Sequence, residues 1–367
     1  MEALAAPDSR DIARRFQLEP EVRWVRPYGN GHINATFLVG CGEPGGERRY
    51  LLQRVNASVF KDPLALMGNL GRVTRHVRAR LAQEGVENLE RHALALVPSL
   101  EGRDFVQDEE GGYWRCFPFI EGTRTLGAVE NAAQAVEAAR AYGAFQRLLG
   151  DLPPPSLVPT IPHFHDAGLR FQAFSEALDQ DPHNRANQAV PEIRFAFGNR
   201  ALADFFAGFI ARGDMLERIV HNDTKLDNLL FEATADTALC VVDLDTVMPG
   251  LPLYDFGDLA RSAACSAVED ESRLDKVRVE PSLFGALAKG FLEGTGEDLN
   301  AVERENLVGA TQVFAYTLGL RFLTDFLEGD RYFRILREGH NLDRARVQFA
   351  LLRDLQERED ELRAAAT

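Results

Sequence analysis

The chain has 367 residues, of which 45% are hydrophobic and 26% are charged, so it can fill two hydrophobic cores. Its formal net charge of −15 argues against binding to nucleic acid, and the arginine-rich stretch at 72–80 has the spacing of a solvated helix face. The N-terminus has charges where a signal peptide needs an apolar core, the chain has no apolar run of membrane-spanning length, and its four cysteines form no C-x-x-C pair. We therefore expect a cytoplasmic protein that binds neither nucleic acid nor membranes; its oligomeric state stays open.

The first third of the chain has the pattern of a small antiparallel sheet. Short β-patterned runs at 22–28, 35–40 and 49–55 alternate with turn-rich segments, and an amphipathic helix is predicted over 62–82. Two further strands are predicted at 92–99 and 113–122. Alanine-rich helical segments follow at 129–150, at 168–216 and through most of the chain after Leu259. The predicted fold class is α+β, with an N-lobe at 1–121 and a mainly helical C-lobe at 122–367.

A polar cluster, HNDTKLDNLL at 221–230, stands just before a predicted β-hairpin. The apolar runs 229–231 and 239–245 flank a polar segment, and a turn centred between Ala235 and Asp236 would place Asn228 opposite Asp243. An amide oxygen beside a carboxylate suits Mg²⁺, which keeps several waters and shares its other positions with phosphate. A one-residue slip would turn Asp243 to the other face.

The pattern H-x-D-x-x-x-x-N at 221–228, followed about fifteen residues later by Asp243, is the arrangement of a kinase catalytic loop. It predicts that Asp223 is the catalytic base or orients the acceptor hydroxyl, while His221 holds the loop. Leu-Asp follows Asp243 where a protein kinase has Phe-Gly. This departure favours small-molecule kinases of the same fold, the aminoglycoside phosphotransferase and choline kinase superfamily.

Seven segments in order, at 28–37, 51–56, 117–122, 161–166, 221–228, 241–258 and 319–333, together resemble the N-acetylhexosamine 1-kinases of that superfamily. The resemblance implies a protein-kinase-like fold and the phosphorylation of the anomeric hydroxyl of N-acetylglucosamine or N-acetylgalactosamine, with ATP and Mg²⁺. Homoserine, choline, aminoglycosides and methylthioribose are acceptors elsewhere in the superfamily. The residues themselves do not distinguish 1-phosphate from 6-phosphate products.

The segment GNGHIN at 29–34 is expected to be a hairpin loop over the ATP phosphates, because glycine lets backbone donors approach closely. Since an asparagine stands where the third kinase glycine would be, polar side chains are expected to replace part of the backbone contact. The predicted nucleotide-binding residues of this hairpin are Gly29, Gly31, His32, Asn34 and Thr36.

Four further residues are assigned to the nucleotide and the sugar. Arg54 is expected to be the cation on the α and β phosphates, and backbone groups around Phe119 are expected to pair with adenine. By resemblance, Arg321 and Tyr332 contact the sugar. A structural alternative for Arg321 is an ion pair with Asp325, four residues along the same helix.

Several assignments stay open at the sequence level. Asp255 and Asp258 are expected to brace the hairpin, whereas Lys225, Asp227 and Asp245 have no firm role. The segment VVDLDTV also matches the haloacid-dehalogenase signature, in which Asp243 would be a phosphatase nucleophile and Asp245 a general acid. That signature opens an α/β domain with parallel strands, and helices are predicted here instead.

Overall fold

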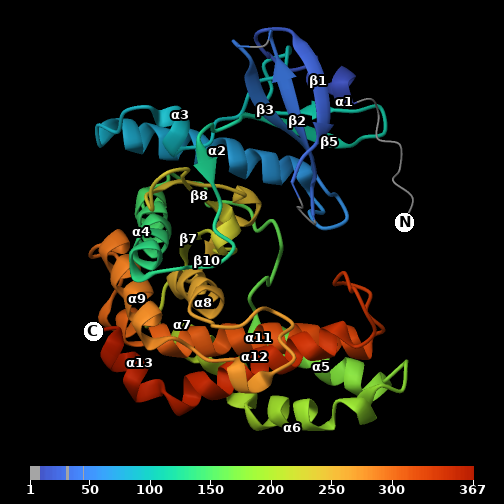
Figure 1. The fold of residues 1–367 in the computed structure, drawn as a ribbon, viewed down its shortest axis with the longest axis vertical. Coiled ribbons are helices and arrows are strands. Elements are labelled where there is room, and N and C mark those ends of the chain that lie inside the picture. The colour runs from blue at the N-terminus through green and yellow to red at the C-terminus, as the bar shows by residue number, and fades with distance from the viewer. Residues whose placement is uncertain (1–8, 30–32, 44) are drawn as a thin grey trace.

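The computed structural model describes residues 9–29, 33–43 and 45–367 and has two lobes (Figure 1). The upper lobe is built on a five-stranded antiparallel sheet in the order β1-β2-β3-β5-β4. Its strands are β1 (Val22–Pro27), β2 (Ala35–Cys41), β3 (Arg48–Arg54), β4 (Val106–Gln107) and β5 (Tyr113–Pro118), and α1 (Ser9–Ala13) packs beside β1. The predicted α+β class is confirmed.

Helix α2 (Pro63–Gln83) lies between the sheet and the lower lobe (Figure 1). Asp62 caps its N-terminus by accepting a hydrogen bond from the backbone N–H of Ala65 at 2.9 Å, and a proline occupies the first turn, where no N–H is needed. Its apolar face carries Leu70 and Val73, which share a hydrophobic cluster with residues from both lobes.

One predicted strand is absent. Residues 92–99 end the short helix α3 (Leu89–His92) and then run as an irregular segment with a single bridge at Ser99. The backbone N–H of Val97 still donates to Cys116, but Pro98 has no N–H to extend a ladder. The edge position of the sheet belongs instead to β4.

The lower lobe is mainly helical, as predicted. Helix α11 (Leu307–Leu327) is buried along most of its length and packs against α5 (Ala167–Gln180), α8 (Pro252–Ala263) and α12 (His340–Glu357). Helix α4 (Ala132–Leu149) packs closely on α9 (Pro281–Thr295), where a Cβ at Gly290 would lie 2.2 Å from the Val136 carbonyl oxygen. The other helices are α6 (Val190–Gly198), α7 (Phe205–Arg212), α10 (Ala301–Glu305) and α13 (Glu359–Ala365).

Two small sheets lie at the top of the lower lobe, facing the upper one (Figure 1). The first has the order β6-β8-β9, from β6 (Thr123–Arg124), β8 (Leu229–Glu232) and β9 (Ala238–Val241). The second pairs β7 (Arg218–Val220) with β10 (Met248–Gly250). Because the chain leaves the upper sheet at Pro118 and enters the lower lobe at β6, we propose residues 121 and 122 as the lobe boundary.

Among the helices of the described residues, none combines the length and the apolar character needed to cross a membrane.

Candidate active site

The catalytic hairpin forms, but its register differs from the prediction by one residue. Leu229 pairs with Val241 and Leu230 with Cys240, and a bulge then places Phe231 opposite Ala238. The predicted pairing of Asn228 with Asp243 is therefore wrong. Asn228 ends a 3₁₀ turn, and its backbone carbonyl accepts from the N–H of Val242 at 2.9 Å.

Asp243 directly follows Val242, whose N–H binds the Asn228 carbonyl, and its backbone leaves the strand direction at this point. It adopts a left-handed conformation with φ of 58°, and the 3₁₀ turn η4 (Leu244–Thr246) begins immediately after it. No hydrogen bond or ion pair to its carboxylate is present among the described residues. Enclosure by protein, and then the neighbouring carboxylates of Asp245 and Asp223, raise the pKa of Asp243 to about 6.

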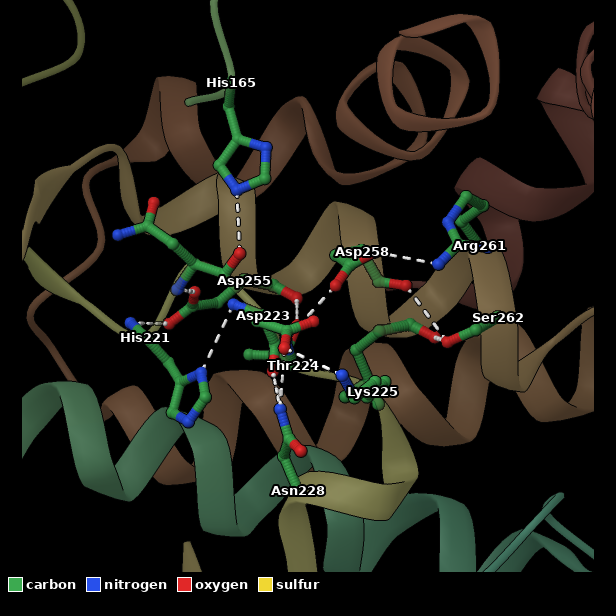
Figure 2. A network of polar contacts seen from close by, with 12 residues as sticks. His165, His221, Asp223, Thr224, Lys225, Asn228, Asp255, Asp258, Arg261 and Ser262 are labelled. Carbon is green, nitrogen blue, oxygen red and sulfur yellow. Dashed lines mark hydrogen bonds and ion pairs between the residues drawn. The ribbon is translucent and has the colours of Figure 1, made fainter. Parts of the chain in front are cut away.

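Asp223 lies at the centre of the polar network in Figure 2. One carboxylate oxygen accepts from the ammonium group of Lys225 and from the side-chain amide of Asn228, both at 2.9 Å. The same Asn228 amide also donates to the Asp223 carbonyl at 2.9 Å. Burial would lower the pKa of Lys225, but the Asp223 carboxylate raises it overall, so Lys225 stays charged beside the site.

His221 is fully buried and uses both ring nitrogens to hold the loop. Its Nδ1 accepts from the backbone N–H of Asp223 at 3.2 Å, so the proton resides on Nε2, which donates to the Val242 carbonyl at 3.0 Å. The ring thereby links the loop that carries Asp223 to the strand that carries Asp243. Edge contacts with Tyr142 and Phe145 fix its orientation.

Two aspartates of α8 brace the loop from below, as expected. The buried carboxylate of Asp255 accepts from the backbone N–H groups of His221 at 2.9 Å and Asn222 at 2.7 Å. Asp258 accepts from the N–H of Thr224 at 3.2 Å and pairs with Arg261. The Asn222 backbone is left-handed, with φ of 66°, so these bonds hold a tight turn directly before Asp223.

The proline-rich connection contributes His165, which the sequence analysis did not assign. Its Nε2 lies 2.8 Å from the carbonyl oxygen of Asn222, directly before Asp223 (Figure 2). The ring packs against Tyr254 and Phe314, and burial lowers the pKa of His165 to about 4. The ring is therefore neutral near pH 7, and its Nε2–H donates to the carbonyl of Asn222.

The position of Arg54 corrects its predicted role. Successive residues of a strand point to opposite faces, and Arg54 lies on the outer face, where it pairs with Asp108 at 3.3 Å and Glu110 at 3.1 Å. The preceding residue, Gln53, is on the face that contacts the lower lobe, together with Arg115 of β5, its partner in the sheet register. Arg54 thus lies on the face of the sheet opposite to Gln53 and Arg115, which does not favour the phosphate-binding role predicted for it.

Arg115 is the residue that the sequence did not reveal. It is only 1% exposed and forms a two-pronged ion pair with Asp245, with Nη2 3.0 Å from Oδ2. Asn34 donates to the same carboxylate at 2.7 Å, and Thr36 accepts from the side chain of Gln53 at 3.2 Å. In the sequence, Arg115 could be noticed only as a charged residue inside the otherwise mostly apolar strand YWRCFP.

The structure describes some of the other residues that were predicted to bind the nucleotide. Gly31 and His32 lie outside the described residues, whereas Gly29 has the positive φ of 73° that a loop glycine tolerates. The N–H of Phe119 donates to the carbonyl of Arg49 at 2.9 Å, so this N–H is already used within the sheet. Its ring packs under the Arg49 guanidinium, 4.5 Å from the ring centroid.

Arg321 and Tyr332 lie together on the lower lobe. The Arg321 guanidinium is 3.4 Å from the Tyr332 hydroxyl and stacks on Phe333 at 5.3 Å. The alternative ion pair with Asp325 does not form, because Asp325 accepts from the backbone N–H groups of residues 331–333 and organises that turn. Arg321 is near enough to His165 for its positive charge to lower the pKa of that ring further.

The donor set fits a divalent cation. The amide nitrogen of Asn228 is bonded to Asp223, which leaves its oxygen free to point at a metal, and the Asp243 carboxylate has no competing partner in the described part of the chain. The described residues contain no group of three acidic, histidine or cysteine ligands. Two hard oxygen ligands suit Mg²⁺, which takes its remaining ligands from water and phosphate.

Similarity to known proteins agrees with this geometry. An aminoglycoside phosphotransferase from Alicyclobacillus acidocaldarius aligns over 100% of this chain and 96% of its own, with 14% identity and a TM-score of 0.60. A microcompartment-associated aminopropanol kinase gives 14% identity, 96% and 98% coverage and a TM-score of 0.57. A choline kinase from Cryptosporidium parvum aligns over 96% of each chain, with 15% identity and a TM-score of 0.55.

At these identities the solved structures establish the fold, and they confirm the predicted two-lobed, kinase-like architecture. The sequence itself carries the assignment further, because residues 24–286, more than half of the chain, match the phosphotransferase enzyme family, APH. This range includes the polar loop, the hairpin and α8. The chain therefore belongs to the APH phosphotransferase enzyme family.

Proposed function

We propose that the protein transfers the γ-phosphoryl group of ATP, with Mg²⁺, to the anomeric hydroxyl of an N-acetylhexosamine to give the 1-phosphate. The observation that carries the kinase chemistry is the position of Asn228. Its side chain holds Asp223, and its backbone holds the strand end next to Asp243. Asn228 thus connects Asp223, the proposed acceptor-side carboxylate, to the chain that carries Asp243, the proposed metal-side carboxylate.

The residues divide the reaction between them. Asp223 accepts a hydrogen bond from the acceptor hydroxyl and takes its proton as the new O–P bond forms, while the bond between the γ-phosphorus and the β–γ bridging oxygen breaks and ADP leaves with that electron pair. Lys225 forms an ion pair with this carboxylate at 2.9 Å and so helps to hold its orientation. Asn228 and Asp243 would hold Mg²⁺, which supplies neutralising charge to the phosphates when bound. Because phosphoryl transfer has a loose transition state, this positioning matters more than the strength of the base.

The sugar assignment is supported by the resemblance of seven ordered segments and by the position of Arg321. The Arg321 guanidinium and the 68% exposed Tyr332 lie together and offer hydrogen-bonding groups to a sugar, which supports the proposed role of both residues. A sugar offers several hydroxyls to such donors, and a simple amino alcohol offers one. Kinases of other small hydroxylated acceptors share the same catalytic loop and form the alternative.

The phosphatase alternative is disfavoured by Asp245. A general acid must reach substrate, but Asp245 is 2% exposed and its carboxylate is occupied by Arg115 and Asn34. In addition, the secondary-structure elements that follow Gly250 in the described residues are all helices. The phosphatase signature would instead be followed by the strands of a parallel sheet.

The test is a panel of free N-acetylhexosamines, hexoses, amino alcohols and aminoglycosides, incubated with ATP and Mg²⁺ and followed by phosphorus-coupled proton NMR. We expect a new phosphorus coupling to the anomeric proton of an N-acetylhexosamine, and its absence with Asp223→Asn. Phosphorylation of an amino alcohol alone would overturn the sugar assignment. Release of phosphate from phosphomonoesters without ATP would overturn the kinase assignment.

A further inference from the structure

We propose that Arg115 and Asp245 form a positioning pair that couples the nucleotide-covering strands of the upper lobe to the metal carboxylate Asp243. This inference rests on the proposed function and deepens it, because it names residues that prepare the nucleotide site. It also assigns the cation that faces the lower lobe to Arg115 on β5 instead of to Arg54 on β3.

The pair joins two lobes through bidentate geometry. Arg115 of the upper sheet directs Nη1 and Nη2 to the two oxygens of Asp245, which follows the catalytic hairpin of the lower lobe. Side-chain exposures are 1% for the arginine and 3% for the aspartate. Such a planar, two-bond contact fixes orientation as well as distance.

On the upper-lobe side, the pair reaches both strands of the nucleotide-covering hairpin. Gln53 accepts from Nε of Arg115 at 3.0 Å and from Nη2 at 2.9 Å, and donates in turn to Thr36 of β2. Asn34 donates to Asp245 and accepts from the backbone N–H of Asn56 at 3.0 Å. Asn34, which directly precedes β2, is therefore tied to Asp245 of the lower lobe.

On the lower-lobe side, Asp245 is held two residues from Asp243. The carbonyl of Asp245 accepts from the hydroxyl of Thr160 at 2.7 Å, and the flanking Leu244 and Val247 are buried in the interlobe cluster. The left-handed backbone of Asp243 is thus anchored on its C-terminal side by a turn that cannot rotate freely. Arg115 is close enough for its charge to act on Asp243.

A purely structural role for the pair makes a different prediction. Buried ion pairs contribute little net stability, because desolvation of the charges offsets their attraction. A pair kept only as packing should affect melting temperature and leave nucleotide affinity unchanged. A positioning pair should change the affinity for Mg-nucleotide even where the variant remains folded.

The experiment measures MgADP binding by titration calorimetry, without any sugar, in the full chain. The double variant Arg115→Gln/Asp245→Asn removes both charges and leaves no unpaired buried ion. We expect its Kd for MgADP to rise by at least about tenfold. The matched control is Glu84→Gln/Arg147→Gln, which removes a bidentate pair between α2 and α4 outside the cleft and should leave the Kd within about twofold.

A second variant covers the case in which the double variant does not fold. Arg115→Lys keeps the charge but loses the two-pronged contact and a bond to Gln53, so its Kd should rise by about threefold to tenfold while the protein stays folded. A wild-type Kd in either folded variant would overturn the proposal. If the wild-type protein binds no MgADP, the proposed kinase function fails instead, so the two failures are distinguishable.

Discussion

His165 provides a pH-dependent test of how the acceptor side of the catalytic loop is held. Its ring donates to the carbonyl that precedes Asp223 and is surrounded by Tyr254 and Phe314. Burial lowers its pKa from 6.5 to about 4. The charges of Asp258 and Asp223 oppose this shift, and that of Arg321 adds to it.

The sign of the effect follows from proton binding. Between about pH 4 and 6.5 the unfolded chain binds a proton at His165 and the folded chain does not, so stability rises with pH over this window. The stabilising contribution is complete above the unfolded pKa and is lost as pH falls toward the folded one. From pH 8 to pH 5 the loss is about 2 kcal/mol at most, since partial exposure of the residue allows water to screen the charge.

The assay is urea unfolding of the wild-type protein and His165→Gln at several pH values. We expect the free energy of unfolding of the wild type to fall more steeply below about pH 6.5 than that of His165→Gln, by up to about 2 kcal/mol. The exposed neighbour His163→Gln is the control and should follow the wild type. Parallel curves for wild type and His165→Gln would refute the assignment of a neutral, buried ring.

Three further changes test the site. Asp223→Asn should lower kcat by about 10² to 10⁴ while the Kd for MgADP stays near the wild-type value, and a loss of nucleotide binding with normal turnover would contradict its assignment. Asp243→Asn should abolish turnover at ordinary Mg²⁺ concentrations, and activity that persists at wild-type Mg²⁺ would show that Asp243 is no ligand. Arg321→Ala should raise the KM for the acceptor by about tenfold with little change in the KM for ATP; equal effects on both would place it outside the acceptor site.

The sequence predicted the two lobes, the helix between them and the catalytic hairpin because hydrophobic period and turn residues determine these features locally. It could not fix which face a single residue occupies. The register differs by one residue from the prediction, so the backbone of Asn228 bonds to Val242, and Asp243 follows with a left-handed backbone outside the strand. The left-handed backbone conformation of Asp243 could not be predicted, because it does not alter the pattern of hydrophobic residues.

The sequence analysis selected Arg54 and missed Arg115 for the same reason: the sequence does not show which face of β3 or β5 a residue occupies. Adjacent strand residues point to opposite faces, and Gln53 and Arg54 are both polar, so the local sequence does not say which faces the cleft. The decision comes from a partner 62 residues away, Arg115, and from Asp245 in the other lobe. Such contacts depend on tertiary packing and are outside the reach of a single motif.

The hydrophobic cluster around α2 has a consequence for how this protein unfolds. Phe117 of the upper sheet, Val73 of α2, Phe145 of α4 and Leu244 beside the metal site all belong to one buried group. Separating the lobes would expose these side chains to water together, so neither lobe has an independent core at this contact. We expect one cooperative denaturation transition for the two lobes.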